Sequence, residues 1–343
     1  MLTTIAWKRL LLGAFILLIT GVLLMLFFSA FSILLPFSPN ASNTISYEEP
    51  QDTLHTSILS RLGLVPRSHR AHTIVGVMIE NHEAARPHQE GLADALLVEE
   101  FLVEGFISRF VALFDTQYLP SSIGPVRSLR PYFIDGVRPW VSAIFYAGGS
   151  PDALKHVEEV NLRHFNGLGL PNHFIRKEGI PAPHDLFLPR SSLRDLLSTI
   201  DVRPIQWPPY LIGPSMSTEK ASVIAVNFFS PIHNVIFTFD PLSQSYTRRN
   251  GGIISDAHPT NIIILEIPIK NIGESGRLEI NTTGIGRALL YRSGTVQAGQ
   301  WSKASVNDPF VLSDLKGNPL TFAQGQTWMM VLPELDRVKW KEE

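Results

Sequence analysis

The sequence of 343 residues contains no cysteine. A chain without cysteine has no thiol nucleophile, no disulfide framework, no cysteine-ligated zinc or iron–sulfur site, and no thiol for lipid attachment. A strong charge of one sign is also missing, because 29 basic and 31 acidic residues give a formal charge of −2 and form no basic stripe. Nucleic acid is therefore not expected as a partner.

The composition excludes two further classes of protein. With 45% hydrophobic and only 17% charged residues, the chain has enough apolar surface to form a core and is not expected to be disordered. The 25 prolines and 24 glycines are spread along the sequence, which excludes a coiled coil or a helical repeat. A globular protein is the class that is left.

Charge is absent from one long stretch near the N-terminus. No charged residue stands between Arg9 and Glu48, and Leu10–Leu35 is an almost unbroken apolar run of 26 residues. As a helix this run reaches roughly 39 Å, enough to cross a membrane, and it is longer than the core of a signal peptide. Basic residues precede it, so residues 1–9 are predicted to be cytoplasmic and the rest extracytoplasmic. Cleavage near Ser29 is the alternative.

The rest of the sequence predicts an α+β protein with two domains. We assign residues 1–35 to the cytoplasmic tip and transmembrane anchor, 36–72 to a stalk, 73–203 to a layered sheet/helix domain, 204–214 to a linker and 215–340 to a smaller, mostly-β domain. In the first domain, strands are expected at Thr73–Glu80, Leu96–Val103, Arg109–Phe114 and Val141–Ala147, and helices at Pro131–Val137 and from Ser150-Pro151 through Val160. In the second, strands are expected at Ser222–Phe228, Val235–Phe239, Asn261–Ile267, Gly286–Tyr291 and Thr327–Leu332.

The standard enzyme signatures are missing as well. The segment that begins with His82-Glu83 ends in Arg86, so it is not the two-histidine zinc helix. The stretch Gly148–Asp152 lacks the last glycine of a nucleophile elbow, and Gly284–Gly286 lacks the third glycine of a dinucleotide loop. Ser217–Lys220 matches S-x-x-K without its companion motifs. No cofactor and no metal are predicted.

Charged and polar residues gather at predicted turns and strand ends of the first domain. Two arginines stand just before a predicted helix start, where backbone N–H groups favour an anion. Their planar guanidinium groups also fit carboxylate or phosphate. The candidate ligand-binding residues are Glu80, Asn81, Arg86, Arg109, Arg127, Ser128 and Arg130.

Three residues are candidates for catalysis. Glu100 and Glu104 are four apart on a predicted strand and are expected to point to one face, where a carboxylate pair can divide acid and base roles. His184, followed by Asp185, adds a titratable imidazole. Three interpretations stay open for the whole set: structural ion pairs, a cleft for an anion or polymer, and a catalytic site.

These residues lie in segments that resemble the YerB-like bacterial lipoproteins, a family catalogued as a domain of unknown function. The resemblance covers about residues 73–335 and is most specific at Gly124–Ser128 and Ala147–Pro151. Further matching segments are Val77–Asn81, Ala85–Pro87, Gly91-Leu92, Val103–Gly105, Ser108–Phe110, Arg130–Phe133, Ala182–His184, Tyr246–Arg248, Asp256, Asn261–Ile263, Gly284–Gly286, Trp301–Lys303 and Gly325–Trp328.

The resemblance implies a membrane-tethered surface protein with an α+β first domain, but it does not indicate a particular activity. The chain departs from the family pattern at Leu96 and Asp185, and it lacks the lipidated cysteine that members often carry. We therefore expect a single-pass envelope protein that binds an anionic or glycan component of the cell wall. An envelope hydrolase that uses the carboxylate pair and a scaffold for a membrane protein are the alternatives.

Overall fold

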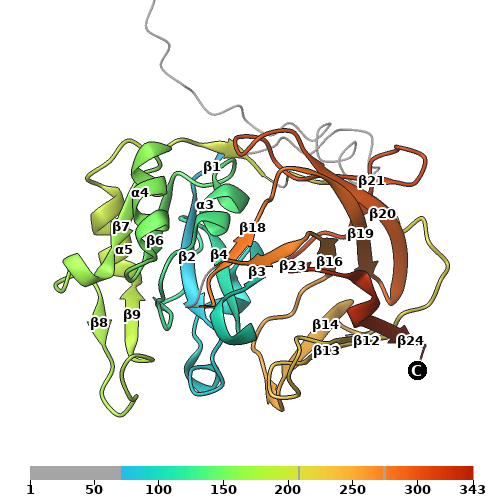
Figure 1. Cartoon of the computed structure of the whole chain (residues 1–343), viewed down its shortest axis with the longest axis horizontal. Coiled ribbons are helices and arrows are strands. Elements are labelled where there is room, and N and C mark those ends of the chain that lie inside the picture. The colour runs from blue at the N-terminus through green and yellow to red at the C-terminus, as the bar shows by residue number, and fades with distance from the viewer. Residues whose placement is uncertain (1–70, 208, 273–275, 343) are drawn as a thin grey trace, which may run out of the picture. The chain divides into compact units, whose positions relative to one another are not determined.

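The computed structural model describes residues 71–207, 209–272 and 276–342 (Figure 1). The predicted transmembrane segment, and all but the end of the predicted stalk, lie outside these residues. Within these ranges no helix is long and apolar enough to cross a membrane.

A ten-stranded mixed sheet forms the centre of the fold, and several of its strands stand side by side in Figure 1. Seven of them, β2, β3, β6, β7, β16, β20 and β23, run in the same direction, so their carboxyl ends share one edge. In spatial order the strands are β21 (Val311–Asp314), β20 (Thr295–Lys303), β19 (Gly284–Arg292), β16 (Asn261–Glu266), β23 (Thr327–Leu332), β3 (Leu97–Leu102), β4 (Ser108–Asp115), β2 (Ile74–Glu80), β6 (Ala143–Tyr146) and β7 (His164–Asn166).

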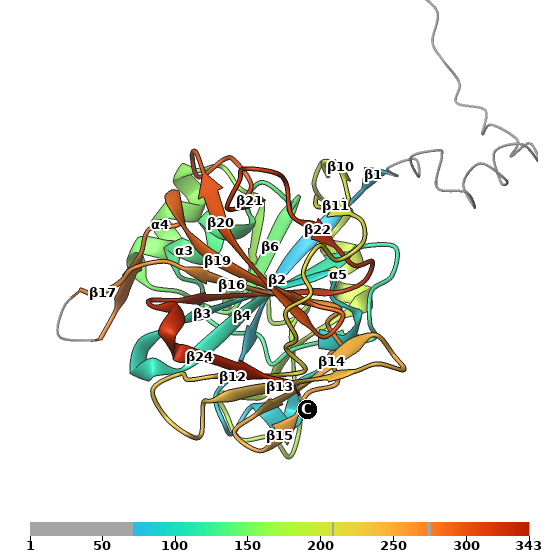
Figure 2. The same ribbon diagram turned by 90° about the vertical axis from the view of Figure 1, so that its right-hand side faces the viewer.

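A second sheet of five strands packs against part of the central one, and Figure 2 shows it below the fan of central strands. It contains β15 (Ile253–Ile254), β14 (Ser245–Asn250), β13 (Val235–Asp240), β12 (Val223–Val226) and β24 (Val338–Lys341). Shorter strands pair β1 (Ala71–His72) with β10 (Ile205–Gln206), β11 (Leu211–Ile212) with β22 (Thr321–Phe322), β17 (Ile269–Asn271) with β18 (Leu278–Ile280), and β9 (Leu186–Pro189) with β5 (Ser122–Ile123) and β8 (Ile175–Arg176).

Helices are few and short in the part of the chain that the structure describes. The predicted helix Pro131–Val137 is confirmed as α3, with proline at its first position, and the next is confirmed as α4 (Pro151–Glu159). The Ser150 hydroxyl caps α4 by accepting from the Ala153 N–H at 3.3 Å. The other helices of the described residues are α5 (Arg190–Leu197) and the 3₁₀ turns η1 (Arg86–His88), η2 (Leu92–Asp94), η3 (Glu104–Phe106), η4 (Gly167–Gly169) and η5 (Leu335–Arg337).

The central sheet has two buried faces because side chains alternate along each strand. The sheet-packed face bears Val98 and Phe110 and lies against Phe237 of the five-stranded sheet. The helix-packed face bears Leu97 and Phe101 and lies against α3 and α4.

The coarse fold class is confirmed, since the described chain is a sheet-rich α+β protein with several sheets and few helices. The two predicted domains contribute one half each to the central sheet. They meet where β3 and β23 run parallel, with Leu97 opposite Thr327 and Glu100 opposite Met330. The predicted linker, residues 204–214, contributes β10 and β11.

Candidate functional site

Several of the predicted site residues lie at the edge where the parallel strands end. β2 ends at Glu80 and β3 ends at Leu102, while the antiparallel β4 begins there. Arg109, at the start of β4, is paired in register with Glu80 of β2 and with Phe101 of β3. The carboxyl edge of parallel strands is the usual place for a ligand in open sheets.

The loop that contains Arg127 and Arg130 lies between β2 and β6 and brings these two arginines to the same edge. The Arg127 N–H donates to the Met78 carbonyl at 3.1 Å, and the Arg127 carbonyl accepts from the Ala147 N–H at 3.0 Å. The Leu129 N–H then donates to the Gly148 carbonyl at 2.9 Å. These backbone bonds extend the sheet locally and fix where both arginine side chains start.

We call Arg109, Arg127 and Arg130 the arginine cluster. Arg127 Nε lies 3.0 Å from Glu80 Oε1. Arg130 binds Glu104 as a fork, with Nε to Oε1 at 2.8 Å and Nη2 to Oε2 at 2.9 Å. Burial raises the pKa of Glu104, but the hydrogen bonds from Arg130 and from the Glu104 backbone, together with the positive charges of Arg130 and Arg109, outweigh it and hold that pKa below its usual value. Glu104 is therefore an ionised partner of Arg130.

Arg109 is the unusual member of the cluster. It is only 8% exposed, and among the described residues no carboxylate lies within 4.0 Å of it. Its one acceptor among those residues is the Ser128 carbonyl, 2.7 Å from Nη1. Burial, followed by the nearby Arg130 and Arg127 guanidinium groups, lowers the pKa of Arg109 to about 10. A buried cation without a counter-ion destabilises the fold.

His184 lies beside the cluster and shares Glu80 with it. Its Nδ1 is 2.9 Å from Glu80 Oε2, and its ring stacks on His82 with centroids 5.2 Å apart. Asp185 does not orient this imidazole, because it accepts from Arg176 at 2.5 Å instead. Asp185 and His184 are therefore adjacent in the sequence but contact different side chains.

The prediction that Glu100 and Glu104 form a carboxylate pair on one strand face is wrong. β3 ends at Leu102, and Glu104 lies beyond it in η3. Glu100 is fully buried on the sheet-packed face, where Arg248 Nη2 donates to its two oxygens at 2.8 and 3.0 Å. The Trp328 indole N–H donates to it as well, at 2.7 Å. Each glutamate thus holds a different arginine.

Asn81 and Arg86 are also engaged inside the protein. Arg86 donates from Nη1 to the Ile232 carbonyl at 2.5 Å, and its Nη2 lies 2.7 Å from His233 Nδ1. Asn81 accepts from Arg86 Nε at 3.3 Å and donates to Asn250 Oδ1 at 2.8 Å. Both side chains are buried and tie the two halves of the chain together. These contacts favour a structural role for the two residues over ligand contact.

Sequence reasoning missed Arg248 as the partner of Glu100. Arg248 is 1% exposed, and its guanidinium carbon lies 4.6 Å from the Trp328 ring centroid and 5.1 Å from that of Phe110. The available signal was a glutamate inside the apolar strand β3, which demands a buried cation. Which arginine supplies it depends on packing between distant strands.

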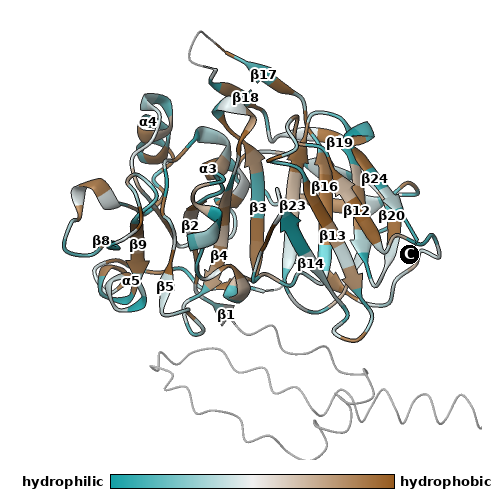
Figure 3. Ribbon diagram, turned by 90° about the horizontal axis from the view of Figure 1, so that it is seen from below, coloured by the Kyte–Doolittle hydropathy of each residue, from teal (hydrophilic) through white to brown (hydrophobic). Residues whose placement is uncertain are grey.

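Glu99, the neighbour of Glu100, was missed too. It lies on the helix-packed face with no exposure, and neither of its oxygens has a hydrogen-bond partner among the described residues. Burial raises the pKa of Glu99 to about 7, with Lys303 acting against the shift. In Figure 3, β3 has a hydrophilic (teal) middle between hydrophobic (brown) ends, in keeping with its sequence LVEEFL.

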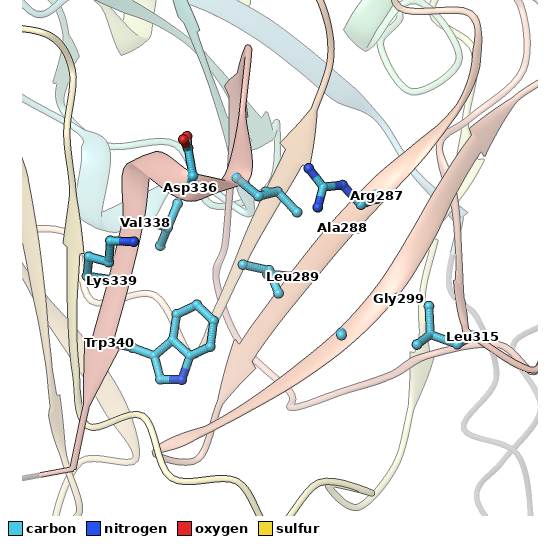
Figure 4. Close-up of a pocket in the computed structure, with 11 residues that line it drawn as sticks. Arg287, Ala288, Leu289, Gly299, Leu315, Asp336, Val338, Lys339 and Trp340 are labelled. Atoms are coloured by element: carbon cyan, nitrogen blue, oxygen red, sulfur yellow. The ribbon is translucent and has the colours of Figure 1, made fainter.

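A cavity of about 600 Å³ lies elsewhere, between β19, β20 and β24 (Figure 4). Leu289 and Trp340 line it, with Arg287, Asp336 and Lys339 at its sides. It contains none of the predicted site residues. In the part of the chain that the structure describes, no group of three His, Cys, Asp or Glu residues is arranged to hold a metal ion.

Comparisons with known proteins agree on one family. The model described as "Protein of unknown function (DUF3048) N-terminal domain" matches residues 63–203, and its C-terminal counterpart matches residues 224–329. "Putative lipoprotein YerB" of Bacillus subtilis (strain 168) is 29% identical over 275 residues, covering 76% of this chain and 82% of that protein. The crystal structure of the Bacillus subtilis YerB protein matches with a TM-score of 0.70 at 27% identity, covering 81% of this chain and 97% of that one.

Proposed function

The chain belongs to the DUF3048 family of proteins of unknown function, and from this membership we propose that it is a membrane-anchored, extracytoplasmic protein of the bacterial envelope. The name of the Bacillus subtilis relative, a putative lipoprotein, supports a membrane-attached location. This chain has no cysteine to carry a lipid, so the apolar run Leu10–Leu35 takes the role of the anchor.

At its described carboxyl edge, the protein binds an anionic group of a cell-wall component through the arginine cluster. The observation that carries this proposal is Arg109, a buried guanidinium that has two other guanidiniums near it and no carboxylate in contact among the described residues. An anion in this place would supply the missing negative charge. Arg127 and Arg130, which are less buried than Arg109, form the outer side of the site.

Glu80 and Glu104, the two carboxylates that contact the arginine cluster, support binding better than catalysis. Glu80 and Glu104 each pair with an arginine, so neither carboxylate is free to act as an acid or a base. Three guanidiniums against these two carboxylates leave one positive charge for a ligand. No contact of Glu100 or Glu104 favours the hydrolase alternative, since both carboxylates are held by arginines.

Retention on purified cell-wall sacculi tests the proposal. The full chain in neutral nanodiscs is expected to sediment with sacculi at low salt and to be released as ionic strength rises, because charge contacts near the surface are screened. The variant with Arg127→Ala and Arg130→Ala is expected to stay in the supernatant. A matched control removes two cations elsewhere, with Lys155→Ala and Lys270→Ala, whose side chains are 78% and 73% exposed.

Equal retention of the arginine and lysine double variants would remove the proposed site. Mass spectrometry of the supernatant covers the hydrolase alternative in the same experiment. Soluble wall fragments that disappear with Glu104→Gln would make the arginines substrate-positioning groups.

A further inference from the structure

An apolar pocket of about 500 Å³ opens at the same edge of the central sheet. The ends of β3 and β23 form part of its wall, through Leu102, Val103 and Pro333. Leu278 of the hairpin β17–β18 lines another side of the pocket, and Phe106 of η3 also lines it. Its volume is in the usual range of about 300–1,000 Å³ for small-molecule sites.

Two strained aromatic residues line this pocket. Phe106 has φ +59° and Phe229 has φ +67°, a backbone region that bulky residues rarely adopt. Their rings lie 4.8 Å apart, and yet Phe106 is 53% and Phe229 is 39% exposed. Burial therefore does not account for holding both residues in a costly conformation. Such strain is typical of positions that clamp a ligand.

The pocket and the arginine cluster share one short turn. Glu104, which holds Arg130, and Phe106, which lines the pocket, are the two ends of η3. Only Gly105 separates them, at φ +72°, so their Cα atoms are at most about 7.6 Å apart. A ligand whose charged group reaches the cluster can therefore place its next few atoms in the pocket.

The two neighbouring surfaces differ in chemistry. The cluster carries a surplus of one positive charge, and three guanidiniums match a group with three acceptor oxygens such as a phosphate monoester. The pocket wall is mainly apolar, with Arg337 over the Phe229 ring at 3.6 Å. A chain of carbon atoms fits such a wall better than a second charged unit.

We propose that the ligand of this edge is an amphiphilic anion, a phosphate monoester on a single apolar chain, with its phosphate in the arginine cluster and its chain against Phe106 and Phe229. This inference rests on the anion site of the proposed function and names its ligand class. A two-chain bilayer phospholipid is a different occupant, and the experiment below separates the two.

The test measures binding of methyl, butyl and hexyl phosphate to the full chain in phosphatidylcholine nanodiscs, by calorimetry with empty nanodiscs as the blank. All three probes are expected to bind in competition with one another. Hexyl phosphate is expected to bind at least about tenfold more tightly than methyl phosphate, because each buried methylene adds to affinity.

Phe106→Asn removes the apolar wall and tolerates the positive φ, so it is expected to abolish the gain with chain length while methyl phosphate still binds. Phe229→Asn is a second variant of the same kind. Leu242→Asn is the matched control, because Leu242 is 95% exposed in the β13–β14 turn, and it is expected to behave as the wild type.

Each contrary result has a separate meaning. Equal affinity for methyl and hexyl phosphate, both lost with Arg127→Ala and Arg130→Ala, overturns the amphiphile and leaves the anion site in place. Loss of hexyl phosphate binding on nanodiscs that contain phosphatidylglycerol overturns the single-chain ligand in favour of bilayer lipid. No binding of any phosphate probe, together with no retention on sacculi, overturns both proposals.

Discussion

The two faces of the central sheet treat buried charge in opposite ways. On the sheet-packed face, Glu100 and Arg248 neutralise each other, and Trp328 donates a further hydrogen bond to the carboxylate. On the helix-packed face, Arg109 has no carboxylate in contact and neither oxygen of Glu99 has a hydrogen-bond partner, among the described residues. Side chains alternate along β3 and β4, and this alternation alone places neighbouring residues such as Glu99 and Glu100 on different faces.

This difference separates structure from function. A buried charge that has an internal partner of opposite charge needs no ligand. The Glu100–Arg248 pair on the sheet-packed face is therefore not expected to bind one. An unpaired buried charge weakens the fold unless protein groups satisfy it, as Asn81, His233 and the Ile232 carbonyl satisfy Arg86, and otherwise it persists where another role retains it. The comparison therefore supports the proposal that Arg109 binds an anion, while Arg248 stabilises the fold.

Breaking the pair on the sheet-packed face is expected to have the largest effect. Glu100→Gln leaves the Arg248 guanidinium without a negative partner in the interior. The free energy of unfolding is expected to fall by about 3–5 kcal/mol in a urea titration. A fall below about 1 kcal/mol would contradict the view that this pair is needed for the fold.

Glu99 on the opposite face is expected to make stability depend on pH. Its pKa is about 7 in the folded protein, against an ordinary value of 4.5, so the folded state holds the proton more tightly. Its contribution is full below pH 4.5 and is lost as the pH rises through 7, on the order of 3 kcal/mol. Glu99→Gln is expected to flatten that part of the curve of unfolding free energy against pH. A wild-type curve that rises from pH 5 to 7 in parallel with that of the variant would refute this.

Replacing the unpaired arginine is expected to have the opposite sign to breaking the pair. Arg109→Met removes a buried charge and keeps an apolar side chain, so the free energy of unfolding is expected to stay equal or to rise by about 1 kcal/mol. Retention on sacculi is expected to be lost at the same time. Destabilisation by several kcal/mol would show that Arg109 is structural, like Arg248.

The smallest effect is expected at Glu104, which lies at the outer side of the cluster. Glu104→Gln weakens a partly exposed fork, so the unfolding free energy is expected to fall by about 1 kcal/mol or less. The apparent affinity for an anion is expected to rise, because Arg130 becomes freer to bind it. A fall in anion affinity would show that Glu104 orients Arg130 for the ligand.

Local signals in the sequence predicted much of the fold. Proline at the first helical position placed α3 over its observed residues, and Ser150 marked the start of α4. The apolar runs placed β2, β3 and β4 to within one or two residues. The resemblance to the YerB-like family is confirmed by the family matches and the relatives.

The site was predicted less completely because its contacts join distant parts of the chain. The sequence brought out Arg109, Arg127 and Arg130, but it does not show that Glu104 leaves the strand after Leu102. Nor does it show that a residue 148 positions away, Arg248, neutralises Glu100. Those contacts follow from the pairing of strands and sheets, which local patterns do not determine.

The most direct test of the account follows the unfolding free energy of the wild type and of Arg109→Met while glycerol phosphate is added at constant ionic strength. The account predicts that Arg109→Met is at least as stable as the wild type without ligand and does not respond to it. It also predicts that the wild type gains about 2.7 kcal/mol at one hundred times its dissociation constant. A variant that is several kcal/mol less stable, and that gains as much from ligand as the wild type, would contradict the claim that Arg109 is held for an anion.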